Sequence, residues 1–143
     1  MSYSQIEIQM VDNSLKDNHY WKKLTSKFAV AGLKFEIHCW RDETEEIKAA
    51  LEFGKEKLTD WELGTIIEGV IDEKFINMLN HTTKPSDTKI YNKMTPFFSI
   101  FIENGFSSEH YGTEFHILPV PVDDVDFMIL LKQLREYAVV NEY

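Results

Sequence analysis

The segment Leu33–Trp40 reads LKFEIHCW, and its apolar and polar side chains alternate along the chain. One side of an extended chain here would be apolar, and the other would carry Lys34, Glu36, His38 and Trp40. Because successive side chains of a strand point to opposite faces, this pattern predicts a strand with one face in the core. We therefore expect a sheet that has one covered face and one open face.

Four further strands are expected from alternation, β-branched residues or apolar runs, at residues 1–10, 61–71, 96–103 and 110–118. In the second of these, Gly69 predicts a bulge or a close approach of another backbone. Residues 96–103 are apolar on both faces, which predicts a central strand covered on each side. Asn104-Gly105 predicts a turn into the last strand, where His110, Glu114 and His116 would face outward.

Helices are expected at residues 18–28, at 43–53, after Asp72 and after Asp123 or Asp124. Asp42 and Glu45 have the spacing of a capping box for the second helix. The apolar stripe of the last helix continues to Ala138. Together these elements predict an α+β fold with a mixed or mainly antiparallel sheet of about four to five strands and helices packed against it.

Size and composition predict one globular domain over residues 1–143. Ten Phe, six Tyr and three Trp supply ample apolar surface for a core. Cys39 is the only cysteine, which excludes an intrachain disulfide and suits a reducing cytoplasm. Residues 1–10 lack a basic segment followed by an apolar run, and no run of about 18 apolar residues occurs, so we expect neither export nor membrane insertion.

The negative charge is concentrated in two segments. The formal net charge is −9, and residues 41–73 hold eleven acidic and four basic side chains, a balance of −7. Residues 122–143 hold five acidic and two basic side chains, a balance of −3. This distribution argues against binding nucleic acid directly, because phosphate neutralisation needs clustered Lys and Arg. It suits either a solvated surface or a surface for a basic partner.

No catalytic or cofactor motif is present. The chain lacks a Gly-rich phosphate loop, a G-x-S-x-G elbow, an H-E-x-x-H motif and a calcium loop. The best constellation is His110, Glu114 and His116 on one strand face, with Glu36 and His38 as further candidates, which could hold a metal or act as a base with its orienting partner. Polar residues are also the default on an exposed strand face, so we expect no catalytic residue, metal or cofactor. Cys39 is expected to be a buried hydrophobe.

A docking surface is the interpretation we favour for the acidic 41–73 segment. Tryptophans flank it, and an exposed tryptophan suits the aromatic anchors that dominate many protein interfaces, although core tryptophans are commoner. The expected partner-binding residues are Trp40, Asp42, Glu43, Glu46, Asp60, Trp61 and Glu62.

In general character the chain resembles the immunity proteins of bacterial contact-dependent growth inhibition and related polymorphic toxin systems. These are small, acidic, cytosolic α+β domains without catalytic motifs, and the likeness covers the whole chain without a shared signature. The resemblance implies a protein that binds and neutralises the C-terminal toxin domain of a secreted effector, often a nuclease. The alternatives are a small metal- or His/Glu-dependent enzyme using the His110, Glu114 and His116 face, and an acidic adaptor or regulatory subunit.

Overall fold

The computed structural model describes residues 4–11, 15–86 and 91–143 and builds them around one antiparallel sheet. The eight strands are β1 (Ile6–Met10), β2 (Lys34–Trp40), β3 (Lys55–Lys57), β4 (Gly64–Val70), β5 (Ser99–Ile102), β6 (Phe106–Glu109), β7 (Glu114–Ile117) and β8 (Ala138–Glu142). Their order across the sheet is β3-β4-β2-β5-β6-β7-β1-β8. All seven neighbouring pairs are antiparallel.

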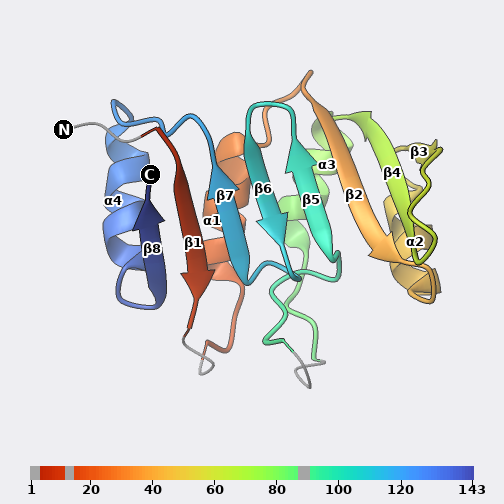
Figure 1. Ribbon diagram of the computed structural model, residues 1–143, viewed down its shortest axis with the longest axis horizontal. Helices are drawn as coiled ribbons and strands as arrows, with labels where there is room; N and C mark the ends of the chain where they lie inside the picture. The colour runs from red at the N-terminus through yellow and green to blue at the C-terminus, as the bar shows by residue number, and fades with distance from the viewer. Residues whose placement is uncertain (1–3, 12–14, 87–90) are drawn as a thin grey trace.

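The helices of the described chain all lie behind the sheet in Figure 1, so no helix covers the face toward the viewer. They are α1 (His19–Phe28), α2 (Thr44–Ala50), α3 (Glu73–His81) and α4 (Val125–Leu134). None of these helices has the length and apolar character that crossing a membrane would require. The open face predicted from the alternation in β2 is therefore present across the whole width of the sheet.

The α+β class and the antiparallel pairing are confirmed, but the expected four to five strands are too few. Three short strands were missed. β3 is an exposed Lys-Glu-Lys edge strand without apolar alternation. β6 is a Ser-rich stretch that we expected to be part of the loop between β5 and the return strand. The prediction that the last helix continues to Ala138 was wrong, because α4 ends at Leu134 and the chain then forms β8.

Helix capping follows the sequence at two of three places. Asp72 and Asp124 each accept a hydrogen bond from the backbone N–H three residues later, at 2.9 and 3.1 Å, as N-cap residues do. The predicted Asp42–Glu45 capping box is wrong. Glu43 occupies the N-cap of α2 and makes no side-chain capping bond there, because its carboxylate is engaged elsewhere.

The core lies between the sheet and its helices. Buried side chains of α1, α3 and α4 meet those of the strands, including Trp21, Phe75, Phe127, Phe35 and Ile37. β5 is central, as expected, but its outer face is not covered by a helix. Phe101 lies half-buried on that face and packs against the ring of His38 at 4.7 Å. The prediction that β5 is covered on both faces is therefore wrong, because Phe101 stays partly exposed on the open face beside His38.

The turn between β5 and β6 requires glycine at position 105. Gly105 has φ +89°, and an added Cβ would lie 1.6 Å from the backbone oxygen of Leu118. We expect Gly105→Ala to lower the free energy of unfolding by about 2–3 kcal/mol. Gly32→Ala is the matched control, because Gly32 has φ +94° with nothing within 4 Å of an added Cβ, and should cost only about 1 kcal/mol. Equal losses in urea unfolding would contradict the steric explanation.

Candidate functional site

The two tryptophans that flank the acidic segment pack against each other at one end of the sheet. Trp40 ends β2, Trp61 lies in the loop before β4, and their ring centroids are 5.2 Å apart in an edge-to-face arrangement. The Trp61 indole lies over Gly64, the register partner of Trp40, and an added Cβ at Gly64 would lie 2.1 Å from the ring. The two loops are also joined by a hydrogen bond from the Arg41 N–H to the Leu63 carbonyl. Both indoles remain partly exposed.

Glu43 fastens this end of β2 to a distant turn. One carboxylate oxygen accepts a 2.8 Å hydrogen bond from the Trp40 backbone N–H, and the other accepts a 2.9 Å bond from the Tyr111 hydroxyl. Burial and the bond to Glu43 raise the pKa of the Tyr111 phenol, so the hydroxyl stays a donor. Glu43 therefore links the end of β2 to this turn, and both of its carboxylate oxygens are already engaged within the protein.

An aromatic groove of about 960 Å³ extends from Trp40 toward the turn after β6. Phe98 packs against Trp40 at 4.9 Å and against Tyr111 at 5.2 Å, and Tyr91 stacks on His110 at 5.7 Å. These aromatic neighbours were not predicted from the sequence. They come from segments more than 50 residues away from Trp40, and no local periodicity reports such proximity.

The turn that forms one wall of the groove has an unusual backbone. His110, Tyr111 and Gly112 have φ values of +51°, +60° and +83°. Positive φ is uncommon for residues with side chains, and such residues often occur at functional sites, where the surrounding structure holds them in place. Here the Tyr111 N–H donates to the Phe98 carbonyl, and the Thr113 hydroxyl donates to the His110 carbonyl.

The seven expected docking residues divide into three groups. Trp40 and Trp61 are together, and Asp42, Asp60 and Glu62 are exposed on the two joined loops. The other two, Glu43 and Glu46, are half-buried. One oxygen of Glu46 is buried without a hydrogen-bond partner among the described residues. Among these acidic side chains, those of Asp42, Asp60 and Glu62 are the most exposed.

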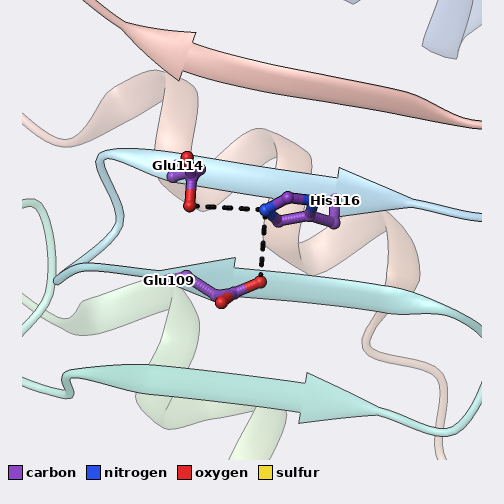
Figure 2. Close-up of side chains that lie close together, drawn as sticks. All are labelled: Glu109, Glu114 and His116. Atoms are coloured by element: carbon purple, nitrogen blue, oxygen red, sulfur yellow. Dashed lines mark ion pairs between the residues drawn. The ribbon is translucent and has the colours of Figure 1, made fainter.

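A second polar cluster lies on the open face at β6 and β7, where Figure 2 shows His116 between Glu109 and Glu114. The Nε2 atom of His116 lies 3.3 Å from Glu114 Oε2 and 3.4 Å from Glu109 Oε2. His110 was expected on the same strand but lies in the turn, because the segment 110–118 is a turn followed by a shorter strand. Its Nδ1 atom still reaches Glu114 Oε2 at 3.2 Å.

Glu36 and His38 do not join that cluster. β5 and β6 separate β2 from β7, so the two groups of side chains lie on different parts of the open face. Glu36 instead contacts the His38 ring at 3.0 Å and Lys57 Nζ at 2.7 Å. The hydrogen bonds from Lys57 and His38 lower the pKa of the Glu36 carboxyl. Alternation along β2 correctly predicted their shared face, while strand order determined their neighbours.

Cys39 is buried on the core side of β2, as expected from the alternation. Burial, with a smaller contribution from Glu43 and Glu46, raises the pKa of its thiol to about 12. The thiol is therefore protonated at neutral pH. A nucleophile would need the opposite shift, so the structure gives Cys39 no feature of a reactive cysteine.

Comparisons with known proteins give no relative for this chain. No protein-family model, curated protein or solved structure matches it. We therefore infer function from the side chains at the end of the sheet and on its open face.

Proposed function

We propose that this protein is an immunity protein that binds a basic toxin domain, namely a nuclease, through the end of its sheet. The docking surface comprises Trp40 and Trp61 with the exposed carboxylates of Asp42, Asp60 and Glu62. Binding would cover the toxin's active site inside the cell that makes both proteins. The proposal assigns the chain no catalytic step.

The observation that carries the proposal is the tryptophan pair. Trp40 and Trp61 stay partly exposed, while Gly64 lies against the Trp61 ring and Phe98 packs against Trp40. Rigid aromatic side chains that are packed on one side lose little freedom when a partner covers the other side. Such residues supply most of the binding energy in many interfaces.

The negative charge of the two loops favours a basic partner. The loops 40–43 and 58–63 hold four acidic residues and one basic residue, Arg41. A nuclease domain carries positive charge around its active site because it must hold phosphates. Opposite charges speed the encounter of two proteins and help to set their orientation, whereas the tryptophans would supply affinity.

The proposal is tested by co-expressing this protein with the protein encoded directly upstream of its gene. We expect a one-to-one complex in size-exclusion chromatography and relief of the growth arrest that the upstream protein causes when expressed alone. A complex that does not relieve growth arrest would indicate an adaptor and contradict the immunity role. Absence of any complex would contradict the proposal as well.

A further inference from the structure

The open face of the sheet brings together three carboxylates and an imidazole from three neighbouring strands. Glu7 comes from β1, Glu109 from β6, and Glu114 and His116 from β7. Register explains the gathering, because Glu7 pairs with His116 and Glu109 pairs with Glu114 across the sheet. Alternation then directs all four side chains to the same face.

The spacing around His116 matches that of metal ligands. In a tetrahedral zinc site with bonds of about 2.0–2.1 Å, neighbouring ligand atoms lie roughly 3.3–3.4 Å apart. The distances from His116 Nε2 to Glu114 Oε2 and Glu109 Oε2 are 3.3 and 3.4 Å. One ligand atom from each of the three residues lies within 4.8 Å of the other two, a gap that rotation of a glutamate side chain can close. Figure 2 shows the three groups converging.

Neighbouring side chains contact these three residues in the way that the outer shell of a metal site contacts its ligands. Glu7 Oε2 lies 3.9 Å from Nδ1, the other ring nitrogen of His116. Metal-binding histidines commonly direct that second nitrogen toward a carboxylate, which fixes the tautomer and the ring orientation. The Ser107 hydroxyl donates to Glu109 Oε2 at 2.8 Å, so the glutamate is oriented as well.

The negative charge of this cluster also favours a bound cation. Within the described residues the ion pairs of Glu7, Glu109 and Glu114 are all made with imidazoles, and only 14% of the Glu114 side chain is exposed. The Glu36–His38 pair on the same face provides a contrast, since Lys57 lies 2.7 Å from that carboxylate. A divalent ion would supply at the first cluster the permanent positive charge that Lys57 supplies at the second.

We propose that Glu109, Glu114 and His116 bind one first-row divalent metal ion, with Zn²⁺ as the best-fitting member of the class. One nitrogen and two carboxylate oxygens suit Zn²⁺ better than Ca²⁺, which takes six to eight oxygen ligands. Three protein ligands leave at least one position open on the exposed face. This site is separate from the docking surface, and neither proposal depends on the other.

The test is isothermal titration calorimetry of the purified, chelator-treated protein with ZnCl₂ and, separately, CaCl₂. We expect one Zn²⁺ per chain and no measurable heat of Ca²⁺ binding. His116→Ala and Glu114→Gln should each weaken Zn²⁺ binding at least about 100-fold, and Glu7→Gln about tenfold. His38→Ala is the matched control, a histidine on the same face beside a glutamate, and should leave Zn²⁺ binding unchanged.

Two results would overturn the proposal. One is a lack of Zn²⁺ binding by the unaltered protein at millimolar metal. The other is an equal loss for His38→Ala and His116→Ala, which would place the metal elsewhere or show surface adsorption. Circular dichroism and urea unfolding of each variant separate loss of a ligand from loss of the fold, and Glu109→Gln provides a second ligand change if His116→Ala does not fold.

Discussion

Replacement of Trp61 by alanine is expected to weaken binding of the toxin domain by about 3 kcal/mol, roughly 100-fold in Kd. The indole lies over Gly64, and its ring centroid is 5.2 Å from that of Trp40. The ring is therefore held in place before a partner binds. Truncation removes the contact area and also the support of its neighbour. Surface plasmon resonance with the immobilised toxin domain measures the change.

Two further variants separate the indole from its loop. Leu58→Ala alters a side chain that is 97% exposed in the same loop, and should change Kd less than twofold. Gly64→Ala keeps both tryptophans but places a Cβ 2.1 Å from the Trp61 ring, so the ring must move. A normal Kd for Gly64→Ala, or equal losses for Leu58→Ala and Trp61→Ala, would contradict a preformed aromatic anchor.

The largest loss of stability is expected for Trp21→Ala, about 3–5 kcal/mol in the free energy of unfolding. Trp21 on α1 is 1% exposed, and its ring N–H donates to the Ser108 hydroxyl at 2.9 Å. The same ring packs against Gly112, which follows the positive-φ residues of the groove wall. Removing it would leave a cavity and an unpaired buried hydroxyl.

Urea unfolding at equilibrium measures this loss, and Ser108→Ala isolates the hydrogen bond. We expect Ser108→Ala to cost about 1–2 kcal/mol, because it leaves the indole N–H without its buried partner. A Trp21→Ala loss no greater than that of Ser108→Ala would show that the indole contributes little beyond one hydrogen bond.

Local patterns predicted much of the fold. Alternation in Leu33–Trp40 correctly placed each side chain of β2, and Asp72 and Asp124 cap their helices. Gly69 was expected to mark a bulge or a close approach, and the close approach is confirmed, since an added Cβ would lie 2.7 Å from the Phe53 carbonyl. Each of these features depends on neighbours in sequence or on one nearby backbone, which is why the sequence reports them.

The candidate sites could be predicted only in part. The sequence indicated that Trp40 faces outward, but the contacts that support it come from Phe98 and, through Glu43, from Tyr111. Glu43 looked like another surface carboxylate because periodicity gives its position on a helix and not its tertiary partner. Glu109 was missed because β6 lacks an apolar alternation. Strand order, which no local pattern specifies, decides these neighbours.

The central claim is that the exposed carboxylates beside the tryptophans guide a basic partner to this end of the sheet. The direct measurement is the association rate constant of the toxin domain with the triple variant Asp42→Lys, Asp60→Lys and Glu62→Lys, at low and high salt. The control, Glu52→Lys, Asp123→Lys and Glu136→Lys, makes the same change in net charge at exposed positions outside the two loops. We predict a loss of at least about tenfold at low salt for the first variant only, shrinking as salt rises. Equal rate constants for the two triple variants would contradict the claim.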